Sequence, residues 1–422
     1  MFARADAPMR PFAASADPIF RRPAMPESAA VIGAARPAQP RIAPACRPDA
    51  LPLDDVIAVV AARRDEFDRL SHVPRDVVEL FKRAGLYRAG TPTRFGGDAR
   101  PPAEFLGMIE RIATADGSAA WVASFGSANV YLAALPLATQ EAIYAAGPDQ
   151  VFAGGLFPVQ PARQAPGGWR VDGTWKFASG CKGADWLGVG IAIPSADGEA
   201  PGKPRTAVLR PEQVEIVENW DVIGMQGTGS HDLRVVDQFV AEPWTFVRGG
   251  APTVDEPLYR YPSVAYAAQV LAVVNLGLAR AALDTVNRMS GGRKTTTGAP
   301  RLADRAYFRI ELAKAEAQLR AARAFFYEAT DEVWQAIVDG RDVRPEHVSL
   351  LRLAATHAAR EGAGVVERAY RLGGTPAIYR AHPLQRLLRD AMVVTQHAFL
   401  GEGNFDGAGS VFTGVAPFPG YL

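Results

Sequence analysis

Residues 167–194 read GGWRVDGTWKFASGCKGADWLGVGIAIP, and this stretch decides the middle of the fold. Large and small side chains alternate along its first half, and Asp172-Gly173 is a dipeptide typical of a tight hairpin turn. Further short apolar runs, separated by glycine and proline, continue to about residue 247. The pattern predicts a small antiparallel β-barrel or sandwich over residues 150–250.

Helical patterns lie on both sides of this β domain. Residues 51–149 repeat apolar side chains at helical spacing and predict an N-terminal helical domain. Residues 251–400 contain long amphipathic stretches and predict a C-terminal four-helix bundle, and residues 401–422 follow as a C-terminal tail. The predicted fold class is therefore α+β.

The overall composition excludes several kinds of partner. Forty-six basic residues against forty-five acidic ones give a formal charge of +1, so no global field attracts nucleic acid or a membrane surface. A neutral or small anionic ligand fits better. The two cysteines, Cys46 and Cys181, provide neither a disulfide framework nor a metal cluster. We therefore expect no metal site and a reducing, cytoplasmic location.

Two segments depart from the ordinary composition. Residues 1–50 are rich in proline, alanine and arginine without any period, which predicts a disordered extension. Residues 264–283 are almost wholly apolar, but Gln269, Asn275 and Arg280 interrupt them, so a buried bundle helix explains them better than a membrane span. A single subunit is not expected to cover so apolar a helix, which predicts a homotetramer built on the bundle.

Three stretches, in this order, resemble the acyl-CoA dehydrogenase family. They are AGLYRAGTPTRFGG at 84–97, GGWRVDGTWKFASGCKGADW at 167–186 and LGGTPAIYRAHPLQRLLRDA at 372–391. The resemblance covers roughly residues 52 to 400. It implies the fold of that family, with an N-terminal helical domain, a middle β domain, a C-terminal four-helix bundle and a flavin site.

Within that fold, FASG followed by ADW, and HPLQRLLRD followed by a histidine, resemble the oxygenase components of two-component flavin-dependent monooxygenases. That group includes p-hydroxyphenylacetate hydroxylase and the secosteroid hydroxylase. The resemblance implies that reduced FMN or FAD comes from a separate NAD(P)H:flavin reductase. With molecular oxygen it forms a C4a-hydroperoxide, which hydroxylates an aromatic or heteroaromatic small molecule.

His397 is the catalytic residue that the resemblance implies. Common acyl-CoA dehydrogenases carry a catalytic glutamate about two turns after the RDA motif, whereas this chain continues with MVVTQHAFLG. An imidazole that titrates near neutral pH can accept a phenolic proton or donate to a peroxide oxygen. Earlier in this stretch, His382 and Arg389–Asp390 are expected to be structural. Two alternatives stay open: an acyl-CoA dehydrogenase with Glu402, or a carboxylate elsewhere, as its base, and a non-catalytic oligomer with the flavin fold.

The resemblance also implies flavin contacts at the end of the WKFASG stretch. The strand lies against the isoalloxazine ring in the resembled family, which brings the Ser179 hydroxyl near flavin N5, where it would slow the loss of hydrogen peroxide. Trp175 and Phe177 are expected on one strand face, where they either wall the flavin or pack the barrel.

Three more residues are candidate cofactor contacts. Arg293 in GGRKTTTG matches an arginine that the fold uses for the flavin phosphate, and such a glycine-rich basic loop suits an anion. Gly373 and Gly374 allow the backbone to approach a cofactor closely, although two glycines also end a helix.

The predicted substrate contacts are Trp121 and Asn129. Some phenol hydroxylases of the resembled group have a histidine at the place of Asn129, and a serine where this chain has Gly154-Gly155. Those residues hold the substrate hydroxyl in the resembled enzymes. Their absence disfavours a simple phenol and makes an indole-like, polycyclic or heteroatom substrate a competitor.

Overall fold

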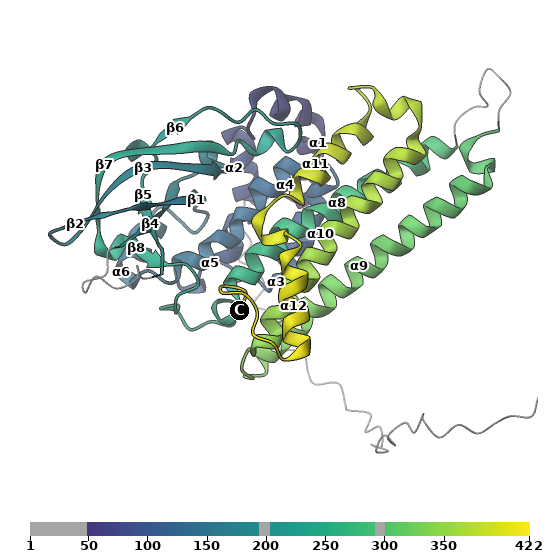
Figure 1. Cartoon of the computed structure of the whole chain (residues 1–422). Coiled ribbons are helices and arrows are strands. Elements are labelled where there is room, and N and C mark those ends of the chain that lie inside the picture. The colour runs from purple at the N-terminus through teal and green to yellow at the C-terminus, as the bar shows by residue number, and fades with distance from the viewer. Residues whose placement is uncertain (1–48, 194–202, 292–299) are drawn as a thin grey trace, which may run out of the picture. The chain divides into compact units, whose positions relative to one another are not determined.

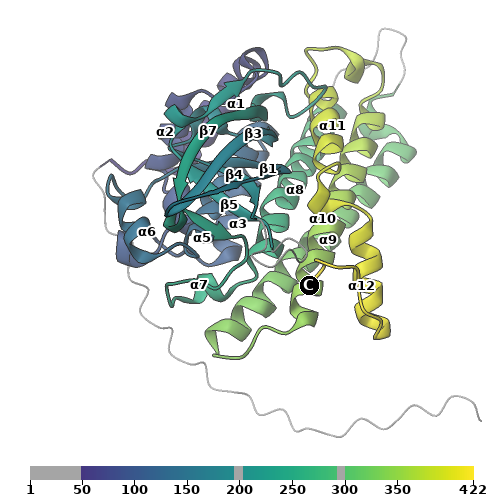
Figure 2. The ribbon, with the colours of Figure 1, turned by 60° about the vertical axis from the view of Figure 1, so that its left-hand side comes forward.

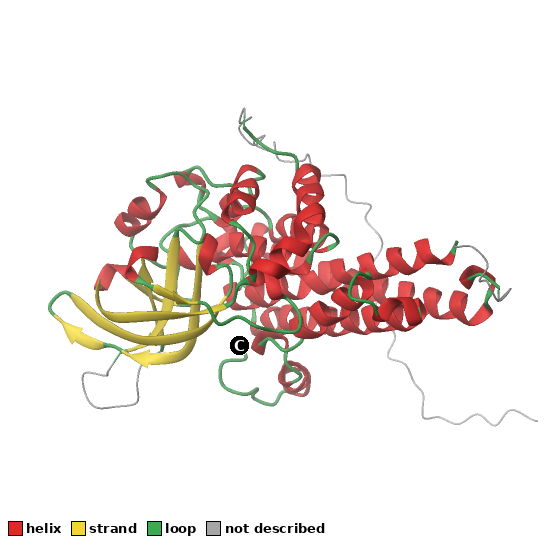
Figure 3. Cartoon of the chain, turned by 90° about the horizontal axis from the view of Figure 1, so that it is seen from above, coloured by secondary structure: helices red, strands yellow, loops and turns green. Residues whose placement is uncertain are grey.

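The computed structural model describes residues 49–193, 203–291 and 300–422, which all lie in one compact unit, residues 46–422. A helical part, a sheet and a second helical part follow one another along the chain (Figures 1 and 3). The predicted α+β order is therefore confirmed. Of the predicted N-terminal extension, residues 1–48 lie outside the described residues.

The N-terminal helical part is built from short helices. One of their starts is fixed by Asp116, whose carboxylate accepts a hydrogen bond of 2.8 Å from the amide of Ala119. Burial raises the pKa of this carboxyl to about 6. The helices are α1 (Leu53–Leu70), α2 (Arg75–Arg83), α3 (Pro102–Ala113), α4 (Gly117–Ala123), α5 (Asn129–Leu132) and α6 (Leu137–Tyr144).

The middle part is one sheet with the strand order β6-β7-β3-β1-β4-β5-β8, and β2 pairs with β3 (Figure 1). Figure 2 shows β7, β3, β1, β4 and β5 of this sheet from another side. The strands are β1 (Phe152–Pro161), β2 (Arg163–Ala165), β3 (Gly168–Ala178), β4 (Trp186–Ala192), β5 (Arg205–Leu209), β6 (Glu215–Val217), β7 (His231–Ala241) and β8 (Thr245–Val247).

The sequence pattern predicted a wholly antiparallel sheet. This prediction is wrong for one pair of strands, because β1 and β4 run parallel. At their contact Gly154 lies opposite Gly188, and a Cβ on Gly154 would come 2.0 Å from the Gly188 carbonyl oxygen. Alternation of side chains along a strand carries no information about the direction of its partner, so the sequence pattern could not predict this pair.

The C-terminal part contains the short α7 (Pro257–Arg260) and the long helices α8 (Ser263–Ser290), α9 (Ala306–Val338) and α10 (Pro345–Gly373). The shorter α11 (Pro383–Val394) completes the predicted bundle. Residues 401–422, which were predicted to be a tail, instead contain α12 (Gly403–Thr413) and a Tyr421 ring that is fully buried.

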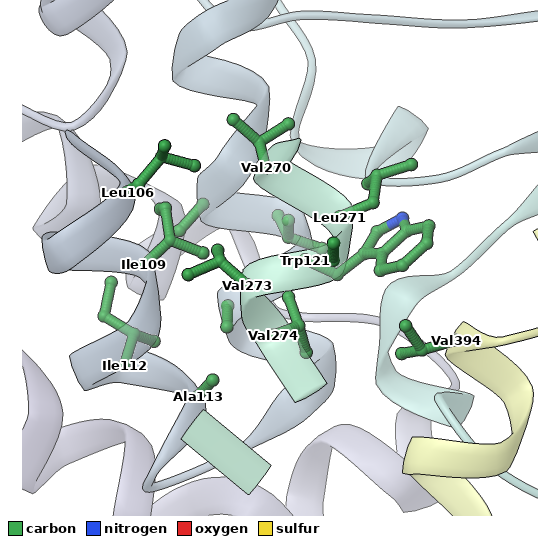
Figure 4. Packing of buried hydrophobic residues seen from close by; sticks show 14 of the residues in the cluster. Leu106, Ile109, Ile112, Ala113, Trp121, Val270, Leu271, Val273, Val274 and Val394 are labelled. Carbon is green, nitrogen blue, oxygen red and sulfur yellow. The ribbon is translucent and has the colours of Figure 1, made fainter. Parts of the chain in front are cut away.

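Helix α8 is the core of the molecule. Val270, Val273 and Val274 of α8 face Leu106 and Ile109 of α3 (Figure 4). By length and composition α8 could cross a membrane, but 83% of its most apolar window is buried inside the protein. The prediction of a buried bundle helix is confirmed, and one chain alone covers it.

The helices around α8 approach it very closely. A Cβ on Gly362 of α10 would lie 2.7 Å from the carbonyl oxygen of Asn275 in α8. The Asn275 side chain ties three helices together, since its amide nitrogen donates to the carbonyls of Ala359 in α10, at 2.7 Å, and Ala391 in α11, at 3.1 Å. Buried polar groups that are bonded in this way fix one register of the helices.

Helix α11 is fixed to the sheet by the residues that the sequence predicted to be structural. Asp390 accepts a hydrogen bond of 2.6 Å from the amide of Met225, and Arg389 donates to the carbonyl of Ile223. Burial and the neighbouring Asp116 carboxyl raise the pKa of Asp390 to about 7. His382 begins α11, where its Nδ1 accepts from the amide of Leu384.

Gly362→Ala should lower the free energy of unfolding by about 1–3 kcal/mol, the usual cost of overpacking a core, because the added Cβ meets backbone atoms of α8. Gly364→Ala, two residues along the same helix, is the matched control. Its Cβ meets only the flexible end of Gln318, so better helix propensity should leave stability unchanged or raise it. Denaturant unfolding measures both, and equal effects would contradict the close contact.

Candidate active site

His397 lies in a cluster of aromatic rings where the chain leaves α11. It precedes the single turn η10 (Ala398–Leu400), and its Nδ1 accepts a hydrogen bond of 3.2 Å from the amide of Phe399. Its ring meets Trp121 of α4 edge-on, with centroids 5.6 Å apart, and Phe399 with centroids 5.0 Å apart. Trp121 itself lies at the edge of the core beside α8 (Figure 4). The structure thus brings the predicted residues Trp121 and His397 together.

The His397 imidazole is neutral at physiological pH. Burial and then the cationic Arg248 lower its pKa to about 4. The expectation that this ring titrates near neutrality is therefore wrong, because sequence position could not report either cause. Since Nδ1 accepts a backbone hydrogen, the proton of the neutral ring is assigned to Nε2. His397 is then a hydrogen-bond donor at Nε2 rather than a base.

Arg248 is the cation of this cluster, and the sequence analysis missed it. Its guanidinium lies 4.3 Å from the ring centroid of Tyr131 and 5.4 Å from that of Phe399. One Nη donates to the Tyr131 hydroxyl at 2.9 Å, and that hydroxyl donates to the carbonyl of Ser263. Arg248 follows the short β8, where one arginine among many gives no signal, and only the tertiary fold brings it to His397.

The turn that carries Phe399 is fixed by hydrogen bonds that involve α10 and α12. Asn404 donates from its amide nitrogen to the Phe399 carbonyl at 2.8 Å and to the Thr356 hydroxyl at 3.0 Å. Its carbonyl accepts a bond from Arg352, which also binds the Tyr421 carbonyl at the C-terminal end. The predicted tail therefore supports the aromatic cluster.

Glu402 does not belong to this cluster. Its side chain is 78% exposed and forms an ion pair of 2.8 Å with Arg360 of α10. A base that removes a proton from a thioester substrate has to lie in the site, so the alternative of an acyl-CoA dehydrogenase loses the carboxylate proposed for it.

A second group of candidate residues lies at the end of β3. The Ser179 hydroxyl is bonded to Ser230 at 2.6 Å, Ser230 is bonded to Thr228 at 2.7 Å, and Thr228 donates to the Met225 carbonyl. This chain of hydroxyl groups fixes the position of Ser179, which is almost buried. Each hydroxyl carries one proton, and that of Thr228 is donated to Met225, so Ser230 donates to Thr228 and Ser179 donates to Ser230. The Ser179 oxygen is therefore left to accept a hydrogen bond from outside the chain of hydroxyl groups.

Trp175 and Phe177 do not share a strand face, contrary to the prediction. A register shift between Trp175 and Ala178 turns the strand, and Phe177 has a positive φ of 61°. The Trp175 ring is 0% exposed and donates to the Gly190 carbonyl, so it packs the core and reaches no cofactor surface. The Phe177 ring is 65% exposed and meets Trp220 edge-on at 6.3 Å.

The two groups of residues are joined through one segment. A Cβ on Gly180, next to Ser179, would lie 3.5 Å from the ring of Phe125 and 3.6 Å from Val122. Val122 belongs to α4 and directly follows Trp121, which contacts His397. The end of β3 and the aromatic cluster therefore both contact the segment 121–125.

Asn129 is not placed to bind a substrate. It is 0% exposed, and its amide nitrogen faces the Tyr87 carbonyl, the Thr91 hydroxyl and the Gln150 carbonyl at 2.9, 3.1 and 3.0 Å. Its amide group therefore connects three parts of the N-terminal region by hydrogen bonds. Gly155 is likewise explained by packing, since a Cβ there would lie 2.9 Å from the carbonyl oxygen of Lys176.

The two glycines that were predicted to contact the cofactor, Gly373 and Gly374, are explained by helix packing and by a helix end. Gly373 is buried, and its added Cβ would meet Leu384 at 2.5 Å, so it allows α10 and α11 to pack together. Gly374 is exposed, has open space around it and ends α10 with a φ of 61°. Arg293 lies outside the described residues. Within the described ranges, no group of three histidine, cysteine or acidic residues could hold a metal ion.

The residues around Ser179 fit an isoalloxazine ring. The exposed Phe177 ring, which meets Trp220, gives an apolar surface two residues from Ser179, and the buried hydroxyl chain gives a hydrogen-bonding edge. The positive φ of Phe177 adds local strain of the kind found at ligand sites. Ser179 and Phe177 would hold the ring, which supplies activated oxygen chemistry when the flavin is reduced.

Comparisons with known proteins agree with this geometry. Residues 269–402 match the family model "Acyl-CoA dehydrogenase, C-terminal domain". The indole-3-acetate monooxygenase of Pseudomonas putida is 54% identical over 361 residues, which cover 86% of this chain and 92% of that protein. The oxygenase subunit HsaA of a flavin-dependent monooxygenase from Rhodococcus jostii is 26% identical over 82% of this chain and 93% of its own length.

A solved structure agrees as well. The crystal structure of 3-HSA hydroxylase from Rhodococcus sp. RHA1 superposes with a TM-score of 0.82 at 25% identity, over 88% of this chain and 98% of that chain. The chain therefore belongs to the flavin-dependent monooxygenases with the acyl-CoA dehydrogenase fold, and it is an oxygenase component that uses reduced flavin and molecular oxygen to hydroxylate an aromatic small molecule.

Proposed function

We propose that the substrate is indole-3-acetate or a closely similar heteroaromatic acid. The similarity to the indole-3-acetate monooxygenase of Pseudomonas putida supports this choice. The observation that carries it is the His397 ring between Trp121 and Phe399, with its Nδ1 already occupied by the hydrogen of the Phe399 amide. Phenol hydroxylation uses a base for the phenolic proton, whereas an indole has no such proton and needs a flat apolar site with a donor.

Each residue has a defined role in this proposal. Trp121 and Phe399 pack against the aromatic ring of the substrate and exclude water. His397 donates from Nε2 toward the oxygen that is transferred. Ser179 holds the proton at flavin N5 through its hydroxyl chain. Phe177 contacts the flavin ring.

An oxygenase component also implies a separate flavin reductase, because the reduced flavin has to come from another protein. We propose that this partner uses NAD(P)H and that both proteins work in the cytoplasm. The free and buried Cys181 is compatible with a reducing compartment.

A substrate comparison tests the proposal. The protein is mixed with a flavin reductase, FMN or FAD, NADH and ¹⁸O₂, and then with indole-3-acetate, 4-hydroxyphenylacetate or an acyl-CoA thioester. We expect one labelled oxygen atom in the product of indole-3-acetate, and a much lower kcat/KM for the phenol. Efficient hydroxylation of the phenol without any reaction of indole-3-acetate would contradict the proposal.

His397→Asn should slow hydroxylation by roughly 10²–10³-fold, the worth of one positioned donor, while flavin still binds. The asparagine oxygen can still accept from the Phe399 amide, so the turn is kept and only the outer donor is lost. In the parent protein the hydroxylation rate should show no His397 ionisation between pH 8 and about 5, because the ring protonates only near its pKa of about 4. An ionisation near pH 6.5 that disappears in the variant would contradict this role.

The same pKa has a consequence for folding. The histidine of the unfolded chain titrates near 6.5, so the unfolded state binds more protons than the folded state between about pH 6.5 and 4. Stability should therefore fall over this window as the pH falls, and His397→Asn should remove that part of the fall.

Ser179→Ala provides the comparison for the flavin side. It removes the first hydroxyl of the chain without disturbing Ser230 and Thr228, which still bond to each other. We expect flavin to bind normally while more hydrogen peroxide is released for each NADH consumed. Unchanged coupling of NADH to product would show that Ser179 serves only the strand end.

We also propose a homotetramer, but for a reason other than the apolar helix α8. The apolar α8 is covered by its own chain and gives no reason for assembly. Exposed apolar side chains do, at Ile378 and Tyr379 after α10 and at Phe412 and Val415 near the end of α12. We expect light scattering to give four times the chain mass at micromolar concentration, and a stable monomer would end this idea.

A further inference from the structure

Arg248 is a half-buried cation whose environment provides hydrogen-bond acceptors but no negative charge. Its guanidinium rests on the faces of Tyr131 and Phe399, and its hydrogen bond to the neutral Tyr131 hydroxyl is the one found for it in the described parts of the chain. No carboxylate of residues 49–193, 203–291 or 300–422 forms an ion pair with it. The Nε atom is buried without a partner.

Two other half-buried arginines of the protein are neutralised by carboxylates. Arg386 pairs with Asp65 and Asp68, and Arg280 pairs with Asp284 and Glu316. A guanidinium that is removed from water loses hydration, and an ion pair or additional hydrogen bonds normally compensate this loss. Arg248 lacks this compensation, so its site is prepared for an anion that comes from outside the chain.

The position of Arg248 indicates which anion. It shares the Phe399 ring with His397, and His397 in turn meets Trp121. The rings of Trp121, His397 and Phe399 thus contact one another in series, and the Arg248 guanidinium lies over Phe399 and Tyr131 at one end of the series. An aromatic substrate that packs on the rings near His397 would therefore direct a short acidic side chain toward Arg248.

We propose that Arg248 binds the carboxylate of an arylacetate substrate and so selects aromatic acids over neutral aromatic compounds. This inference rests on the proposed function, since it assigns the residue that recognises the acid group of indole-3-acetate. The aromatic rings hold the indole, and the methylene carbon bridges the distance from the indole to the guanidinium. Tyr131 orients Arg248 through its hydroxyl and its ring face.

The rings alone would hold indole as well as indole-3-acetate, so the selectivity belongs to Arg248. Losing one partner of a buried, hydrogen-bonded charge pair commonly weakens binding by about 30-fold or more. A neutral amide of the same shape cannot accept two charge-assisted hydrogen bonds, so the parent protein should bind indole-3-acetamide far more weakly than indole-3-acetate.

The test compares indole-3-acetate, indole-3-acetamide and indole on the full chain, by calorimetric binding and by kcat/KM with the reductase present. The variant Arg248→Met keeps the apolar stem of the side chain over Tyr131 and removes the charge. Arg210→Met is the matched control, because Arg210 also stacks on an aromatic ring, 3.7 Å from the centroid of Trp186, but outside the aromatic cluster. Arg248→Lys keeps the charge and loses the planar fork.

We expect the preference of the parent protein for indole-3-acetate over indole-3-acetamide to fall about 30-fold or more in Arg248→Met, and partly in Arg248→Lys. Binding of indole should change less than about 3-fold, which a general loss of packing would not allow. Arg210→Met should keep the preference of the parent protein.

The results that overturn the proposal are separate from those that overturn the function. A parent protein that binds the acid and the amide equally well contradicts the role of Arg248, even if the Arg248→Met protein does not fold. A variant that keeps the preference for the acid, or that loses flavin binding instead, contradicts it as well. If the parent protein binds the acid selectively but oxidises none of the three compounds, the proposed function fails and the Arg248 assignment stands.

Discussion

The packing of α8 is the constraint on which the rest of the structure depends. At Gly362 the neighbouring α10 approaches so closely that a Cβ would lie 2.7 Å from the Asn275 carbonyl oxygen, and at Gly277 a Cβ would lie 2.4 Å from the Glu110 carbonyl oxygen of α3. The Asn275 amide then joins α10 and α11. Because interiors are close-packed and hardly compressible, these contacts fix where α11 ends, and His397 follows directly.

The active-site cluster is a consequence of this scaffold and not of any one segment. Trp121 comes from α4, Tyr131 from α5, Arg248 from the end of the sheet, and His397 and Phe399 from the turn after α11. Burial of the imidazole beside a guanidinium keeps it neutral, because both effects disfavour a second positive charge. The same fold that in dehydrogenases carries a carboxylate base thus presents a neutral donor next to a cation.

Local sequence patterns predicted structural features that depend on residues close together along the chain. Helical spacing predicted the bundle, and His382 and Asp390 are structural as predicted. The hairpin turn predicted at Asp172-Gly173 was wrong, because both residues lie inside β3, where the register with β7 shifts. Properties that arise from contacts between distant parts of the chain could not be predicted from the sequence. They are the parallel pairing of β1 with β4, the register shift that buries Trp175 and exposes Phe177, and the full burial of Asn129. Arg248 could not be singled out, since only the tertiary fold places its guanidinium on Tyr131 and Phe399 beside His397.

The central claim is that His397 acts as a neutral donor in an aromatic site, and its protonation can be measured directly. Nuclear magnetic resonance of ¹⁵N-labelled histidine, assigned with His397→Asn, reports both the tautomer and the pKa of the ring. The account predicts an Nε2–H imidazole that stays neutral from pH 8 to about 5 and a pKa near 4. A ring that protonates between pH 6 and 7, or that carries its proton on Nδ1, would contradict it.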